Sequence, residues 1–349
     1  MELNQFSGPG QPVRHVKVRY FLIALVPILI FSINAVITGD MMAADLRIPP
    51  DILQNERPWL ETAGRYRFLS ATWFFGALSV LAVALLVRNL MRPTARDTLA
   101  AAIITVGIVL ALAVSPTIVH MMDPEGSRIY YRLGADFYEA ALLQGRLPGC
   151  STPGDQWLLG ECGDNPVITL FNKVLDIVNV LAGLSVGALI VSMILCLETR
   201  DGITIEEDAA LQAQNLRQMR QQLYLSSLIL TFGMLFATSW MYWPLPMVQT
   251  SEQAAYGSVV LSAALFTGTY FCLLILSFYL PVALILDGRV RRLTQIADQG
   301  TETGEPLDAE DWRASHGLKE GAVDYIRAGF ALTAPILAAF AGGISPISF

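Results

Sequence analysis

The side chains that could carry chemistry in this chain are few, and they lie near the ends of its hydrophobic runs. Lys173 and Asp176 stand three residues apart, where they could form an outer gate or an ordinary interfacial pair. The central parts of the six clearest runs contain no ionisable residue. Because charges within a membrane usually mark ion or proton paths, this distribution argues against a proton-coupled pump.

Histidine spacing and nucleophile motifs give no support for catalysis. His15, His120 and His316 are isolated from one another, so no spacing suited to metal or haem binding occurs. Glycine-rich phosphate loops, a GxSxG elbow and HExxH are missing. No basic stripe with interleaved aromatics indicates nucleic acid. We therefore expect no catalytic residue, no cofactor, no metal and no nucleic-acid partner, and the chain leans away from an enzyme.

Two stripes of hydroxyl side chains are the main polar feature of the hydrophobic runs. Each follows the spacing i, i+4, i+11, which keeps its members within about 40° of one helix face. The stripes comprise Ser227, Thr231 and Thr238 in one run, and Ser258, Ser262 and Thr269 in the next. Such hydroxyls either hydrogen-bond between helices, the commoner case, or line a hydrated pore. Gly183 and Gly187 form a GxxxG pair that favours close helix approach.

The runs that hold these residues are long enough to cross a membrane. Hydrophobic residues make up 54% of the chain and charged residues 15%, against about 25% charged in soluble domains. A bilayer core requires about 20 apolar residues, and its lack of water requires them to be helical. We predict an all-α, polytopic membrane protein with six transmembrane helices. The spans are Phe21–Thr38, Phe68–Val87, Leu99–Val119, Val174–Leu197, Leu223–Tyr242 and Ser258–Leu286.

A seventh hydrophobic segment ends the chain, over residues 328–349. It contains Pro335, Gly342, Gly343 and Pro346, which are poor interior residues for one straight helix. A re-entrant or interfacial helix is therefore slightly favoured over a seventh span.

Lysine and arginine indicate how the spans are oriented, because short cytoplasmic loops carry an excess of them. The clearest cluster is Arg88, Arg92 and Arg96. It predicts a multi-pass inner-membrane protein with a cytoplasmic N-terminus and an uncleaved first span. The parts are a cytoplasmic tail (1–20), a transmembrane domain (21–287) with outer loops 39–67 and 120–173 and an inner helical extension 203–222, an inner region (288–327) and the segment 328–349.

The outer loops carry three further expectations. We expect loop 39–67 to be irregular, with room for one short helix, whereas Ser127–Gly145 predicts a helix with Ile129, Leu133, Phe137 and Ala141 on one apolar stripe. Cys150 and Cys162 are candidates for a disulfide, since an oxidising exterior permits one. The cluster of Trp240, Tyr242 and Trp243 is typical of a membrane interface.

On the inner side, Thr204 and Glu207 match a capping box that opens a helix running into the fifth span. A seam of apolar character follows, made of Ile205, Ala209, Gln212, Leu216, Met219 and Leu223. It could pack against Val290, Leu293 and Ile296 within one chain, the favoured alternative, or against a second copy. The basic cluster around Arg289 is explained by topology and contact with anionic lipid.

Three functional hypotheses follow. The first is a non-enzymatic, homo-oligomeric pore or ion-channel-like protein that responds to a cytoplasmic signal. The second is a membrane scaffold or accessory subunit of a larger complex. The third is an enzyme or carrier acting on a lipid-like substrate. All three share the lipid bilayer as partner, and the first two imply a homo-oligomer or membrane complex.

Overall fold

The fold was analysed in a computed structural model, which describes residues 13–38, 53, 58–122, 133, 137, 140–141, 143–144, 156–157, 160–161, 166–200, 202–299, 308–319 and 321–343. Cys150 and Cys162 lie outside these ranges, so their disulfide stays a prediction.

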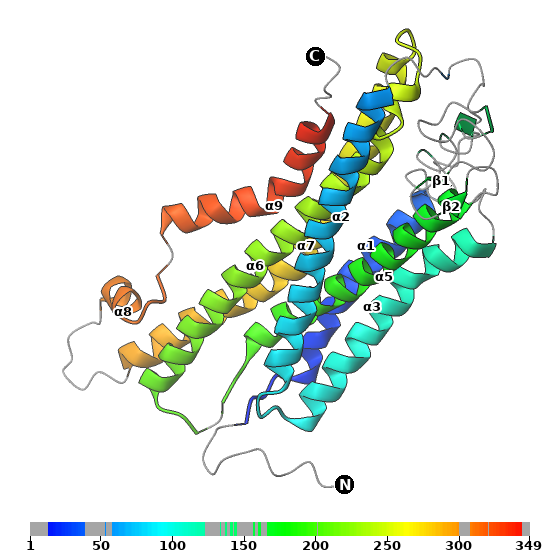
Figure 1. Ribbon diagram of the computed structural model, residues 1–349. Coiled ribbons are helices and arrows are strands. Elements are labelled where there is room, and N and C mark those ends of the chain that lie inside the picture. The colour runs from blue at the N-terminus through cyan, green and yellow to red at the C-terminus, as the bar shows by residue number, and fades with distance from the viewer. Residues whose placement is uncertain are drawn as a thin grey trace, which may run out of the picture.

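The described residues form a bundle of long helices joined at its two ends (Figure 1). The helical elements are η1 Val18–Ala24, α1 Leu25–Val36, α2 Pro58–Leu90, α3 Arg96–Met122, α5 Pro166–Ile194, η4 Leu195–Leu197, α6 Ile205–Tyr242, η5 Leu245–Met247, α7 Gln253–Gln299, α8 Ala309–Ser315 and α9 Ala322–Gly343. A short antiparallel pair, β1 Gln156–Trp157 and β2 Gly160–Glu161, lies at one end. Among the described residues, seven helices are long and apolar enough to cross a membrane, which confirms the all-α polytopic membrane fold.

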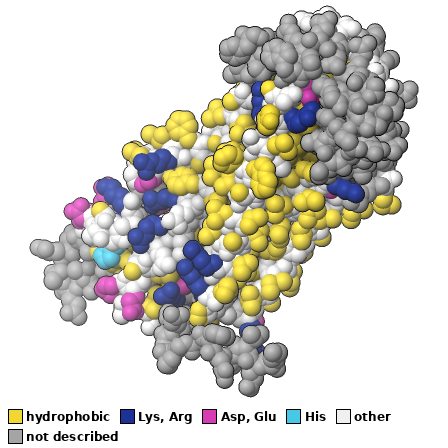
Figure 2. Space-filling view, in the orientation of Figure 1, with side chains coloured by type: hydrophobic (Ala, Val, Ile, Leu, Met, Phe, Trp, Pro, Cys, Tyr) yellow, Lys and Arg dark blue, Asp and Glu magenta, His cyan; other side chains and the backbone are white. Residues whose placement is uncertain are grey.

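Side-chain chemistry divides the surface along the bundle axis. Figure 2 shows hydrophobic side chains over the middle of the molecule, and lysine and arginine gathered toward the end where α6 begins. The exposed apolar residues include Leu29, Phe74, Ile104 and Leu284, which come from four different helices. Because lipid tails are as apolar as these side chains, their exposure is what a bilayer-spanning surface requires.

The part of α6 that precedes its predicted span is packed within the chain. We call the end of the bundle where α6 begins the inner end, and the opposite end the outer end, after the orientation expected from the sequence. The expected capping box is present: the Thr204 hydroxyl accepts a hydrogen bond from the backbone of Glu207, whose carboxylate accepts one in return. From this start the helix runs without a break to Tyr242. Seam residues Leu216 and Met219 are buried in one core with Val290 and Leu293 of α7. The intramolecular alternative is therefore confirmed, except at Ile296, which is 43% exposed.

At the outer end, α2 begins earlier than expected. The prediction that loop 39–67 is irregular apart from one short helix is wrong for residues 58–67, because the long helix α2 already starts at Pro58. Gly64 lets Trp243 pack closely against α2, since a Cβ there would lie 2.9 Å from Cδ1 of Trp243. Trp240 and Trp243 are fully buried against Phe68 rather than placed at a lipid interface, which corrects that expectation too. Helix α2, which carries Phe68, covers both tryptophans.

The second outer loop follows its predicted apolar pattern where it is described. Leu133, Phe137 and Ala141 are helical and buried, as the stripe predicted, while its first member, Ile129, lies outside the described residues. The ring of Phe137 meets Tyr256 of α7 edge-on, at 4.8 Å between centroids. Part of this loop is thus anchored on the outer end of the bundle.

The inner end is closed by a buried ion pair. Residue Arg14 precedes the first span, and its guanidinium pairs with Glu198 at 2.8 Å while donating to the carbonyl of Leu195 at 2.6 Å. Arg289 donates to the carbonyls of Leu197 and Glu198. These are orphan carbonyls at the end of the α5–η4 helix, where cations are favourable. Topology and lipid contact therefore do not fully explain Arg289, because it also caps this helix end.

The C-terminal helix α9 lies along α6 and α7. Arg220 of α6 pairs with Asp324 at 3.4 Å, and a Cβ on Gly342 would lie 2.9 Å from the Thr238 hydroxyl. The two contacts are 18 residues apart on each helix, from Arg220 to Thr238 and from Asp324 to Gly342. At 1.5 Å per residue, α9 therefore runs beside α6 for about 27 Å. Figure 1 shows α9 bent part-way, and Pro335 lies inside it, which explains the bend. One helix of this reach favours a seventh span over a re-entrant segment.

Candidate functional site

An intramembrane cavity of about 530 Å³ lies between α1, α2, α3, α5, α6 and α7. It occupies the half of the bundle nearer the outer loops. Binding pockets for small molecules typically measure about 300–1,000 Å³. Aromatic rings supply much of the wall, namely Phe31, Phe75, Phe236, Phe266, Tyr270 and Phe271. The cavity is therefore of ligand size and mainly apolar.

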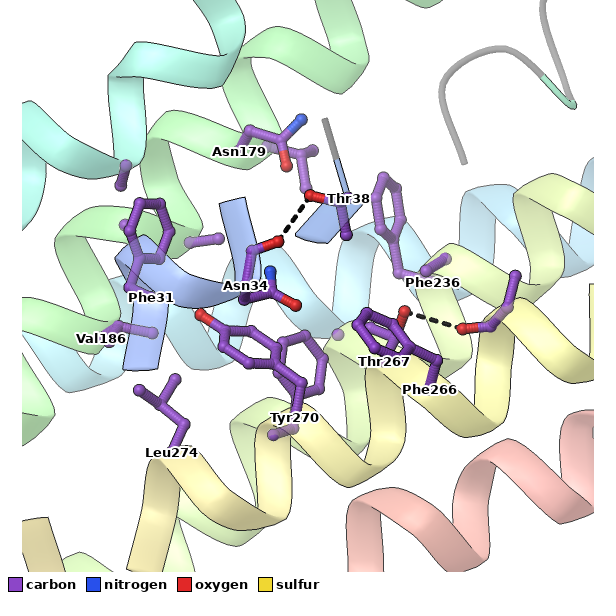
Figure 3. A pocket seen from close by; sticks show the side chains of 18 of the residues that line it. Phe31, Asn34, Thr38, Asn179, Val186, Phe236, Phe266, Thr267, Tyr270 and Leu274 are labelled. Carbon is purple, nitrogen blue, oxygen red and sulfur yellow. Dashed lines mark hydrogen bonds between the residues drawn. The ribbon is translucent and has the colours of Figure 1, made fainter. Parts of the chain in front are cut away.

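Asn34 of α1 is the unusual polar group in this wall. It is 8% exposed, and within the described part of the chain its side-chain amide forms no hydrogen bond. Figure 3 shows the amide among the cavity residues, near Tyr270. Leaving a buried amide without a partner costs roughly 1–3 kcal/mol. The Asn34 amide is thus available for a molecule in the cavity.

The hydroxyl groups of the wall have partners in their own helices. Thr38 donates to the carbonyl of Asn34 at 2.8 Å, and Ser262 donates to that of Ser258 at 2.9 Å. Thr267 donates to the carbonyl of Ala263. Each of these hydroxyl oxygens donates its hydrogen and can still accept a hydrogen bond. They offer weaker and less specific anchors than the Asn34 amide.

No charged side chain and no histidine is among the cavity-lining residues that the structure describes. In a site of low dielectric, an ion would lose its hydration without gaining a counter-charge, at a cost of several kcal/mol. The site therefore favours an uncharged occupant.

The cavity is closed toward the inner side. Val186, Ile190 and Leu274 form its inner end. Beyond them lies the buried apolar core that contains Ile194 and Phe278. The described helices of one chain thus shape a dead-end chamber rather than a path across the bundle.

Helix α1 separates the cavity from lipid. Its buried side chains are Pro27 and Asn34, which stand seven residues apart and both line the cavity. Leu29 and Ile33 on the same helix are 59% and 50% exposed. One helix thickness therefore divides the chamber from the bilayer.

The two hydroxyl stripes do not meet in one lining. Ser258 and Ser262 line the cavity, while Thr269 is exposed and lies outside it. The α6 stripe, made of Ser227, Thr231 and Thr238, does not contribute to the wall. Thr238 instead packs against Gly342 of α9. Helix α6 instead lines the cavity with Gly233, Phe236 and Ala237.

The glycine pair of α5 lies against α3. A Cβ on Gly183 would fall 2.0 Å from Cβ of Ala113, and one on Gly187 would fall 3.5 Å from Cβ of Val109. At the outer start of this helix, Lys173 is exposed and Asp176 is buried. The glycines therefore bring α3 close enough to close one side of the chamber.

Sequence reasoning missed Asn34 and Asn179, both of which line the cavity. It searched the spans for ionisable groups and for hydroxyl periodicity. A carboxamide inside a predicted span is also costly to leave in lipid, and it usually faces other helices or a cavity. Asn34 in the predicted first span and Asn179 in the predicted fourth span are such carboxamides.

No protein-family model, curated protein or solved structure matches this chain.

Proposed function

We propose that this protein binds a lipid-like molecule taken from the bilayer into the cavity between α1, α2, α3, α5, α6 and α7. The observation that carries the proposal is a mainly apolar chamber of about 530 Å³ inside the spanning bundle, one helix away from lipid. This develops the carrier alternative among the three hypotheses. The pore and the scaffold stay predictions.

The energetics of such a site differ from those of a soluble pocket. A ligand that leaves lipid gains little hydrophobic free energy, since lipid tails are as apolar as the cavity wall. Selective binding must come from packing against the aromatic rings and from hydrogen bonds in a site of low dielectric. Both sources are present, in Phe236 and Tyr270 on one hand and Asn34 on the other.

Access from the bilayer follows from the same geometry. The aqueous route from the inner side is blocked by packed apolar residues such as Ile194 and Phe278. On the membrane side, α1 buries few of its own side chains, and Val259 of α7, which lines the cavity, is 40% exposed. We place the N-terminus on the cytoplasmic side, because Lys and Arg gather at the end where α6 begins. The chamber then opens toward the outer leaflet.

The proposal is tested by filling the chamber. Ala263 lines the cavity and is half-buried, so Ala263→Phe should occupy part of it. Ala84 of α2 is exposed, and Ala84→Phe is the matched control. Native mass spectrometry of the purified proteins counts small molecules that remain bound. We expect adducts on the natural chain and on Ala84→Phe, and their loss from Ala263→Phe. Equal adducts on all three proteins would overturn the proposal.

A further inference from the structure

We infer that the molecule bound in this cavity is an uncharged, single-chain amphiphile whose hydroxyl or carbonyl group hydrogen-bonds to Asn34. This inference rests on the proposed function and adds the chemical class of the ligand. Four features of the cavity support it: its charge, its size, the position of its one unpartnered amide and the depth of its apolar end.

The absence of charged side chains from the described lining argues against a phospholipid whose head group enters the cavity. The described lining contains no lysine, arginine or histidine that could pair with a phosphate or carboxylate. Burying either anion without a partner costs several kcal/mol, more than one amide hydrogen bond returns. A phosphodiester head group or an ionised fatty acid is therefore disfavoured against an alcohol, ester or ketone.

Size sets the second limit. A dry cavity of about 150 Å³ holds one benzene molecule, which has six non-hydrogen atoms. By that comparison, 530 Å³ holds on the order of 20 non-hydrogen atoms. That number corresponds to one medium or long hydrocarbon chain with a small polar group. Two acyl chains with a head group exceed it. The chamber thus suits a single-chain molecule.

The polar anchor is the Asn34 side chain. Its amide presents two N–H donors and one acceptor oxygen, so it can recognise a hydroxyl or a carbonyl. It is 8% exposed and faces the cavity, close to Tyr270 and Thr38 in the same view (Figure 3). Since a buried amide strongly prefers a partner, this side chain points to a ligand with a complementary group.

The apolar end of the chamber fixes the orientation of the ligand. Asn34 lies near the outer end of α1, which ends at Val36. Ile190 and Leu274 line the opposite, inner end of the cavity. A ligand with its polar group at Asn34 therefore directs its chain toward the middle of the bundle. This matches the orientation of a lipid in the outer leaflet.

The test compares three probes of equal chain length: hexadecanol, hexadecane and hexadecyl phosphate. Their binding to the purified full chain is measured by native mass spectrometry and by competition. We expect hexadecanol to bind more tightly than the phosphate. Asn34→Leu should weaken hexadecanol binding about tenfold, the effect of one buried hydrogen bond, and leave hexadecane binding unchanged. Ser32→Ala on the same helix, outside the cavity lining, is the control.

Thermal unfolding establishes that each variant is folded. Equal hexadecanol affinity in Asn34→Leu and the natural chain would overturn the assignment of Asn34. Tighter binding of hexadecyl phosphate would overturn the uncharged class. Both results leave the cavity as a binding site, provided that Ala263→Phe still abolishes binding. Hexadecanol binding that persists in Ala263→Phe would instead refute the proposed function itself.

Discussion

The indole nitrogen of Trp243 donates a hydrogen bond to Oε1 of Glu61 over 2.7 Å, which joins the first turns of α2 to the end of α6. Arg65 binds the other carboxylate oxygen at 2.7 Å. Glu61 is fully buried, and the ring of Phe68 lies 5.3 Å from that of Trp243. A charged acid is thus held within an aromatic cluster at the outer end of the bundle.

This arrangement predicts that Glu61→Leu destabilises the protein strongly. The change leaves the guanidinium of Arg65 and the indole N–H of Trp243 without this partner, and breaking a buried pair typically costs roughly 3–5 kcal/mol. Trp243→Phe removes a donor and some packing, and should cost less. Thermal unfolding of the purified protein measures both. Trp73→Phe is the control, because Trp73 is 79% exposed and faces lipid. A Glu61→Leu protein as stable as this control would contradict the prediction.

The inner ion pair predicts a second loss of stability. Burial lowers the pKa of the Arg14 guanidinium, while the nearby Glu198 carboxylate opposes that shift. Without the carboxylate, the guanidinium would remain charged and buried. We therefore expect Glu198→Gln to lower the unfolding temperature markedly, because it removes the counter-charge of a buried cation.

An exposed ion pair on α7 provides the matched control for Glu198→Gln. Asp287 and Arg291 are 2.8 Å apart, with side chains that are 52% and 68% exposed. Surface pairs of this kind contribute about 0–1 kcal/mol. Asp287→Asn should hence change the unfolding temperature little. If the two variants lose the same stability, the buried pair is no more important than the exposed one.

The close contact between α3 and α5 predicts that a larger side chain at position 183 destabilises the protein. Any Cβ at this position overlaps Ala113, so Gly183→Leu must push the two helices apart. Gly107 is the control, because a Cβ there meets nothing within 4 Å. We expect Gly107→Leu to fold normally and Gly183→Leu to express poorly or unfold at lower temperature. Size-exclusion chromatography in detergent and thermal unfolding distinguish the two.

Length and hydropathy sufficed to predict the helices, because a span in lipid has few structural alternatives. The α6 seam was also predictable, since its 3–4 spacing encodes burial without any knowledge of the partner. Glu61 shows where this reasoning stops: nothing local reveals that Trp243 lies beside it. Asn34 is similar, because the cavity that surrounds it is lined by five other helices. Cavities arise where side chains fail to fill space, and that depends on tertiary packing alone.

The position of α9 predicts that the two ends of the chain lie on opposite sides of the membrane. Asp324 lies at the inner end, beside Arg220, whereas Gly342 lies beside Thr238 near the outer end of α6. A reporter fused after Phe349 should therefore respond as an external one when the N-terminus is cytoplasmic. The same reporter fused after Gly321, before α9, should respond as cytoplasmic. If both reporters lie on one side, α9 does not cross the bilayer, and its first turns and its last turns must face the same aqueous phase.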